Sequence, residues 1–216
     1  MRYTRGPQNG PAANRNNGAA FANGNWLIFT DDDCLPDKGW LEAYANAIEQ
    51  YPESKAIEGA ILPDDWELLK RDMAECPVNT DGGCFWSANI AIGKTFFERL
   101  GGFDSSFKLA AHEDKELYER ILKIETVLFI KNAFVIHPVR FISLRSKLKM
   151  IPVRLKNWRK YESSKMGDIS MFFKGINFQL RSFISNIFSG RWKMGFYNIL
   201  VAFLLLPFFI YENLRK

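Results

Sequence analysis

Residues 26–33 read Trp-Leu-Ile-Phe-Thr-Asp-Asp-Asp, and this stretch decides the fold class. A short apolar run with a sharp acidic end is typical of a buried β-strand, and open α/β sheets bind ligands at the carboxyl ends of such strands. Three adjacent carboxylates, Asp31, Asp32 and Asp33, repel one another unless a cation lies among them. A solvated acidic turn is the alternative, but it needs no buried strand directly before it. The sequence therefore predicts a strand that carries oxygen ligands for Mg²⁺ or Mn²⁺.

Strands and helices alternate around this stretch. Apolar positions between Gly10 and Gly24 permit a helix that ends at Gly24. Residues 63–82 are polar and contain proline, so we expect a surface excursion of the kind that forms substrate loops. The alternation predicts an α/β domain. The other predicted elements are helices over residues 38–51, 95–100 and 112–123 and strands over residues 55–62, 85–92 and 126–136.

Charge divides the 216 residues into two unlike parts. Residues 1–137 contain 14 basic and 21 acidic side chains, whereas residues 138–216 contain 15 basic and 3 acidic ones. A basic segment binds nucleic acid or anionic lipid, and the long apolar runs within this one favour lipid. We therefore expect the C-terminal part to contact a membrane surface, and we expect no nucleic acid partner.

The C-terminal part has two sections. Residues 141–193 are basic with apolar residues at helical spacing, which indicates an amphipathic helical segment. Residues 194–211 carry no charge and form about the shortest helix that spans a bilayer. Pro207 leaves an interfacial or re-entrant helix as the alternative. The predicted organisation is an α/β domain over residues 1–140, then the amphipathic segment, then a membrane helix.

The cysteines and the N-terminus bear on the compartment. Cys34, Cys76 and Cys84 form no Cys-x-x-Cys pair and cannot all pair within the chain, so the sequence suggests neither a zinc site nor a disulfide framework. The first residues lack the apolar core of a signal peptide, which gives no reason to expect export. A reducing, cytosolic setting fits best. Together with the basic C-terminal part, it predicts the cytoplasmic face of the cell membrane.

A second group of polar residues opens the helix predicted from residue 112. The group is His112, Glu113 and Asp114, and the dipole of the helix keeps a carboxylate at this position ionised. Asp114 is then able to accept the proton of an attacking hydroxyl group. Helix capping explains an aspartate at this position equally well.

Three motifs follow one another along the chain. They are Gly-Pro-Ala-Ala-Asn-Arg-Asn at residues 10–16, Trp-Leu-Ile-Phe-Thr-Asp-Asp-Asp-Cys-Leu-Pro-Asp at residues 26–37, and Gly-Gly-Phe-Asp with His-Glu-Asp within residues 101–114. In this order the chain resembles the family 2 glycosyltransferases of the GT-A fold over about residues 6–140. The resemblance implies a Rossmann-like mixed sheet and an enzyme that transfers a sugar, with inversion, from a nucleotide-diphosphate donor to a hydroxyl group of a glycan or lipid-linked acceptor.

The resemblance also implies how the donor is held. In such enzymes an Asp-x-Asp motif binds a divalent metal ion, Mn²⁺ or Mg²⁺, on the donor diphosphate. By resemblance these ligands fall on Asp31 and Asp33, with Asp32 between them, and Arg15 lies near the nucleotide. His137 closes the last predicted strand, and a histidine near this point in the family helps to bind the metal. A structural histidine is the alternative.

The remaining implied roles concern the reaction and the acceptor. A Glu-Asp pair supplies the base in the family, which places Glu113 and Asp114 at the catalytic centre with Asp114 as the base. By a weaker analogy, Trp86 and Asn89 line the acceptor side of the pocket.

One difference from the family leaves an alternative open. Family members begin with a strand, a helix and a second strand that bind the nucleotide base, and the motifs here start after them. Such a sheet has an open edge and half a donor pocket. A non-catalytic remnant that binds membrane or a partner enzyme is therefore an alternative to a transferase. A two-metal phosphohydrolase is disfavoured because His112 and His137 are the only histidines to supply further ligands.

Overall fold

The computed structural model describes the backbone of residues 3–110, 112–163 and 169–214, and side chains except at 155, 158–163, 169–175 and 205–214. The chain forms two compact units. The α/β unit comprises Met1–Asp64 and Cys76–Pro138, and the helical unit comprises Asp65–Glu75 and Val139–Lys216. Residues 65–75 lie within the α/β domain predicted over residues 1–140 but belong to the helical unit.

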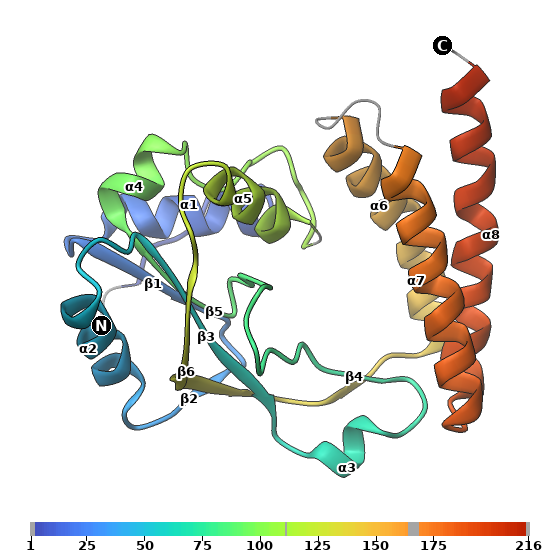
Figure 1. The fold of residues 1–216 in the computed structure, drawn as a ribbon, viewed down its shortest axis with the longest axis horizontal. Helices are drawn as coiled ribbons and strands as arrows, with labels where there is room; N and C mark the ends of the chain where they lie inside the picture. The colour runs from blue at the N-terminus through green and yellow to red at the C-terminus, as the bar shows by residue number, and fades with distance from the viewer. Residues whose placement is uncertain (1–2, 111, 164–168, 215–216) are drawn as a thin grey trace. The chain divides into compact units, whose positions relative to one another are not determined.

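The α/β unit is built on a mixed sheet with strand order β1-β5-β3-β6-β2 (Figure 1). Only the β3–β6 pair is parallel, and the other three pairs are antiparallel. This confirms the predicted α/β class with a mixed sheet. The strands are β1 (Trp26–Thr30), β2 (Leu35–Pro36), β3 (Ala56–Pro63), β5 (Asn89–Gly93) and β6 (Leu128–His137), and the helices are α1 (Pro11–Phe21), α2 (Trp40–Gln50), α4 (Lys94–Arg99) and α5 (Glu113–Leu122).

Helices cover both faces of this sheet (Figure 1). On one face α1, α4 and α5 pack through Ala12, Phe97 and Leu117 against strand residues that include Ile90 and Ile92. On the other face α2 packs through Tyr44 and Ala47 against Ile57, Ala91 and Ala133. Because both faces are covered, the central strands are mostly apolar, as a sheet buried on both sides requires. Among their buried polar side chains, Glu58 and Asn89 both have hydrogen-bond partners.

The side chain of Asn89 joins the two central parallel strands to α2. Its amide donates to Ala60 O at 2.8 Å and to Ala133 O at 2.7 Å, and its carbonyl accepts from Trp40 Nε1 and Tyr44 Oη, each at 2.8 Å. The β3–β6 register shifts between Gly59 and Ile61, so the amide serves carbonyl groups at the irregularity. Such buried carbonyls would otherwise lack partners.

The side chain of Glu58 forms hydrogen bonds with residues 79–85, which lead into β5. Its buried carboxylate accepts hydrogen bonds from the backbone N–H groups of Gly83, Cys84 and Phe85 and from Asn79 Nδ2, at 2.5 to 3.0 Å. Successive N–H groups in a turn form a concave site for an anion. Phe85, at φ 46°, lies within this turn, so the strand predicted from residue 85 begins only at Asn89.

The helical unit joins an internal segment to the end of the chain. The carboxylate of Asp72 accepts hydrogen bonds from Lys193 N and Met194 N at the start of α8, and Arg191 Nη2 donates to Ala74 O at 2.7 Å. Lys147 is buried against Glu75 and the Tyr197 ring. The elements of this unit are α3 (Trp66–Leu69), β4 (Ala74–Glu75), β7 (Arg140–Phe141), α6 (Leu144–Ser163), α7 (Ile169–Phe188) and α8 (Trp192–Leu214).

The structure bears on two further predictions, the surface loop over residues 63–82 and the membrane helix over residues 194–211. The polar stretch 63–82 is not one loop, because residues 65–75 fold with the C-terminal helices. Within the part of the chain whose side chains are described, no helix is long and apolar enough to cross a membrane. Side chains 205–211 of the predicted membrane helix lie outside that part.

Gly59 offers a test of the Asn89 bridge. A Cβ atom at this position would lie 2.0 Å from Ala133 O and 2.3 Å from Asn89 Nδ2. Because the first contact is with backbone, we expect Gly59→Ala to lower the free energy of unfolding by about 3 kcal/mol or more. Urea unfolding followed by circular dichroism measures this loss.

Gly18→Ala is the matched control, because Gly18 lies in α1 and a Cβ atom there meets nothing within 4 Å. This change should leave stability unchanged or raise it by about 0.5–1 kcal/mol. Equal midpoints for the two variants would contradict the close approach of β3 to β6 at Gly59.

Candidate active site

The three acidic residues after β1 take up three different environments. Asp31 hydrogen-bonds to Arg15, Asp32 is exposed, and Asp33 lies beside His137. The backbone turns here, since Cys34 N donates to Asp31 O at 3.2 Å. The short strand β2 follows at once and pairs Leu35 with Ile136 of β6. This pairing brings the acidic turn back to the end of β6, where His137 lies.

Arg15, on α1, connects the first acidic residue to the start of α5. Its Nη2 donates to Asp31 Oδ1 at 3.1 Å, and its Nη1 donates to Glu113 Oε1 at 3.0 Å and lies 4.0 Å from Asp114 Oδ1. Its guanidinium also lies over the Phe103 ring, 5.7 Å from the centroid. Burial lowers the pKa of Arg15, but Asp114, Asp31 and Glu113 outweigh it and raise the pKa. Arg15 therefore brings together Asp31, Glu113 and Asp114 from distant parts of the sequence.

The carboxyl group of Asp114 has a raised pKa. Burial, followed by the neighbouring charge of Glu113, raises the pKa of this carboxyl from 3.8 to about 7. Arg15 and hydrogen bonds from Ser87 oppose the rise without cancelling it. A carboxyl group that titrates near neutral pH suits general base catalysis. Ser87 was not predicted, and its sequence context gives no signal for this contact.

His137 and Asp33 form a second centre with an unexpected third member. His137 Nε2 lies 3.8 Å from Asp33 Oδ1, and the side chain is buried. Possible ligand atoms of Asp33, Cys34 and His137 all lie within 4.8 Å of one another. Carboxylate and imidazole groups are both ligands of divalent ions, so these residues fit the predicted metal. The place of Cys34 beside them was not predicted, because Cys34 belongs to no Cys-x-x-Cys spacing.

The two residues predicted on the acceptor side differ in exposure. Asn89 is 1% exposed, and two donated and two accepted hydrogen bonds use its whole amide. Its contacts are those of a structural bridge. Trp86 is partly buried and packs against the cluster that contains Cys34 and Val135. An acceptor role for Trp86 stays a prediction.

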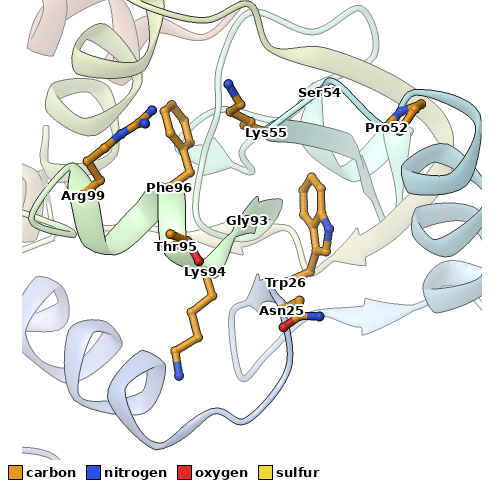
Figure 2. A pocket seen from close by; sticks show the side chains of 10 residues that line it. All are labelled: Asn25, Trp26, Pro52, Ser54, Lys55, Gly93, Lys94, Thr95, Phe96 and Arg99. Carbon is orange, nitrogen blue, oxygen red and sulfur yellow. The ribbon is translucent and has the colours of Figure 1, made fainter.

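A further pocket of about 290 Å³ lies at the opposite end of β1 (Figure 2). Its lining includes Trp26, where β1 begins, and three cations, Lys55, Lys94 and Arg99. Lys94 Nζ donates to Ala22 O at 2.6 Å, and Lys55 Nζ lies 3.4 Å from Glu125. The guanidinium of Arg99 lies over the Phe96 ring, 5.2 Å from its centroid, so all three cations already have protein partners. The pocket is separate from the acidic turn.

The N-terminal third of the chain matches a known protein family. Residues 1–72 match the family model described as Glycosyl transferase family 2. Over these residues the chain is similar to the family 2 glycosyltransferases. The matched residues contain Arg15 and the acidic turn, which confirms the resemblance read from those motifs.

A curated relative extends further along the chain. The glucosyl-dolichyl phosphate glucuronosyltransferase of Haloferax volcanii is 23% identical over 149 residues, which cover 59% of this chain and 47% of the relative. The chain therefore spans about half the length of this glycosyltransferase.

Two solved structures match this chain with TM-scores below 0.5. GalNAc-T7 with UDP, GalNAc and Mn²⁺ has a TM-score of 0.46 at 16% identity, over 70% of this chain and 36% of that one. The mannosyltransferase PcManGT from Pyrobaculum calidifontis, in complex with GDP-Man and Mn²⁺, has a TM-score of 0.48 at 15% identity, over 91% of this chain and 66% of that one.

The raised pKa of Asp114 predicts a pH dependence of stability. Between about pH 4 and about pH 7 the folded protein holds a proton on Asp114 that the unfolded chain has lost. Stability therefore falls as pH rises through this window, by up to about 1.4 kcal/mol per pH unit from this residue, and the contribution is constant above it. Asp114→Asn should remove this contribution. Urea unfolding from pH 4 to pH 8 measures the difference.

Asp81→Asn serves as the control, because Asp81 is an exposed carboxylate of the same unit. We expect its stability to follow the wild-type pH profile. If Asp114→Asn also followed that profile, Asp114 would titrate normally in the folded protein.

Proposed function

We propose that this chain carries the metal-binding and acceptor-binding residues of a glycosyltransferase. The reaction is transfer of a sugar from a nucleotide-diphosphate donor to a hydroxyl group of a glycan or lipid-linked acceptor. One observation carries the proposal: Arg15 joins Asp31, at the end of β1, to Glu113 at the start of α5, with the carboxyl of Asp114 beside them. The family match over residues 1–72 supports the same assignment.

Asp114 is the proposed base. Its pKa of about 7 leaves a substantial fraction ionised at neutral pH, and an ionised Asp114 is still basic enough to take a proton from an acceptor hydroxyl group. The oxygen so activated attacks the anomeric carbon from the side opposite the departing diphosphate, which inverts the configuration. Glu113 raises the pKa of Asp114, and Arg15 keeps the carboxylates from repelling one another.

Asp33 and His137 are the residues proposed to hold a divalent ion, Mn²⁺ or Mg²⁺. Asp33 is the last member of the Asp-x-Asp motif, and the ring of His137 faces it at 3.8 Å. Such an ion neutralises charge on a leaving diphosphate. Asp31 is held by Arg15, which suggests that these two residues contact the nucleotide.

The helical unit is proposed to attach the enzyme to the cytoplasmic face of a membrane. Phe188 is 88% exposed, Trp192 64% and Phe196 54%, at the turn between α7 and α8 and along α8. Exposed aromatic residues among basic ones favour an anionic lipid surface. The Haloferax relative is named for a dolichyl phosphate substrate, and this agrees with a lipid-linked acceptor.

Replacement of the proposed base, Asp114, should affect turnover but not binding of the nucleotide sugar. We expect Asp114→Asn to retain the fold and the affinity for a nucleotide sugar but to lower turnover by about a hundredfold or more. Wild-type turnover should rise with pH through about 7, as Asp114 loses its proton. Release of nucleoside diphosphate from UDP-sugars and GDP-mannose with Mn²⁺ measures the rate, and calorimetry measures binding.

Glu119→Gln, further along α5, is the control and should keep the wild-type rate. Wild-type turnover by Asp114→Asn would rule out the base role. No turnover and no nucleotide-sugar binding by the wild-type chain would favour the non-catalytic alternative.

Membrane attachment is tested on the exposed aromatic residues. We expect the double change Phe188→Ser and Trp192→Ser to weaken binding to phosphatidylglycerol vesicles by about tenfold or more, because each ring contributes apolar area. Co-sedimentation with vesicles at low and high salt measures this. Leu122→Ser is the control, since Leu122 is 50% exposed on the α/β unit. Equal loss in the control, or self-association without vesicles, would contradict a lipid-binding surface.

A further inference from the structure

The turn over residues 100–103 is held by side chains of two helices. From α1, Asn16 Nδ2 donates to Phe103 O at 2.7 Å, and Asn16 Oδ1 accepts from Phe103 N at 2.9 Å. From α5, Nη1 and Nη2 of Arg120 donate to carbonyl oxygens of the same turn at 2.6 and 2.7 Å. Both helices lie on one face of the sheet (Figure 1). The turn therefore links α1, which carries the guanidinium of the candidate site, to α5, which carries two of its carboxylates.

The close approach of the Asn16 amide requires a glycine at residue 102. Gly102 has φ 67°, and a Cβ atom there would lie 2.6 Å from Asn16 Oδ1. Because one amide group bonds both the N–H and the C=O of Phe103, the backbone of Phe103 cannot rotate without the loss of two hydrogen bonds. This two-point contact fixes the direction in which the Phe103 side chain leaves the turn.

The Phe103 ring supports the guanidinium of Arg15. The ring is buried and packs edge to face against Phe29 of β1, with the centroids 5.4 Å apart. Arg15 lies over the same ring, 5.7 Å from its centroid, and a cation is attracted to an aromatic face at this separation. Since Arg15 and Asn16 are consecutive, α1 contacts Phe103 through both its ring and its backbone.

We propose that Asn16 is a positioning residue that keeps Arg15 against Asp114. It acts through the Phe103 ring, and its role in catalysis rests on the proposed function of Asp114 as the base. Arg15 Nη1 lies 4.0 Å from Asp114 Oδ1 but only 3.0 Å from Glu113 Oε1. The contact with Asp114 is the longer one, so a displacement of the guanidinium weakens it readily.

The charge on Arg15 acts directly on the protonation of Asp114. Glu113 raises the pKa of Asp114, and Arg15 lowers it. Asp31, at the end of β1, holds the guanidinium from the other side through a hydrogen bond of 3.1 Å. If Phe103 shifts and Arg15 moves away, Asp114 keeps its neighbour Glu113 but loses part of the opposing charge. Its pKa then rises further.

Asn16→Leu tests the proposal without sugar transfer. Leucine is similar in size but has no donor or acceptor, so both hydrogen bonds to Phe103 are lost. The folded variant should hold the Asp114 proton to a higher pH, so its stability should keep falling about half a pH unit or more beyond the wild-type end near pH 7. Urea unfolding from pH 4 to pH 9 measures this shift. In an Asp114→Asn background the same change should shift nothing.

Two further measurements extend the test. Gly102→Ala should reproduce the shift, because its Cβ atom displaces the Asn16 amide, and it serves as the second variant if Asn16→Leu does not fold. The pH midpoint of turnover with UDP-sugars or GDP-mannose and Mn²⁺ should rise by the same amount in either variant.

Two controls separate the Phe103 contacts from the other effects of a substitution. Asn17→Leu, at the next residue of α1, removes an amide that contacts Arg5 O at 3.5 Å. Ser105→Ala removes the third partner of the Asn16 amide, at 3.1 Å, and leaves both bonds to Phe103. Both controls should keep the wild-type pH range of unfolding.

The outcomes distinguish positioning from a purely structural role. If Asn16→Leu or Gly102→Ala lowered stability equally at every pH, Asn16 would only support the fold and the proposal would be overturned. A shift in unfolding without turnover by the wild type would uphold the action of Asn16 on Asp114 while counting against the proposed function. Turnover with an unshifted midpoint in both variants would do the opposite.

Discussion

The hydrogen bonds of the Asn89 side chain are the constraint on which the α/β unit depends. At the point where β3 and β6 lose register, the amide group supplies two donors to strand carbonyls and two acceptor sites to α2. Buried carbonyls without donors would cost several kcal/mol, so this one side chain makes the irregularity tolerable. The end of β6 beyond it, His137, thereby lies beside Asp33 of the acidic turn.

Interactions between charged side chains then determine the arrangement of the candidate site next to these strands. Carboxylates that repel one another are divided between two groups, with Arg15 among Asp31, Glu113 and Asp114, and with His137 beside Asp33. The division gives neighbouring residues different chemistry: Asp114 is pushed toward neutrality by burial, while Asp31 is paired with a cation. The proposed base and the proposed metal ligands therefore belong to separate groups that share no residue.

Elements that depend on residues close together in the sequence were predicted correctly, whereas contacts between residues far apart in the sequence were not. The strand Trp26–Thr30 ends where the acidic residues begin, as predicted, because an apolar run meets charged residues there. The alternating elements and the family resemblance were likewise predictable from motifs. The bridging role of Asn89 was not, because its partners lie on β3, β6 and α2. The proximity of Cys34 to His137 was not predictable either, because the two come near only through the β2–β6 pairing.

The helical unit is discontinuous in sequence, and this has a consequence for synthesis on the ribosome. Asp72 receives its hydrogen bonds from Lys193 and Met194, which are translated more than a hundred residues later. Residues 65–75 therefore emerge early and stay without their partners until nearly the whole chain has been made. During that interval Met73, buried in the finished unit, is open to chaperones and proteases.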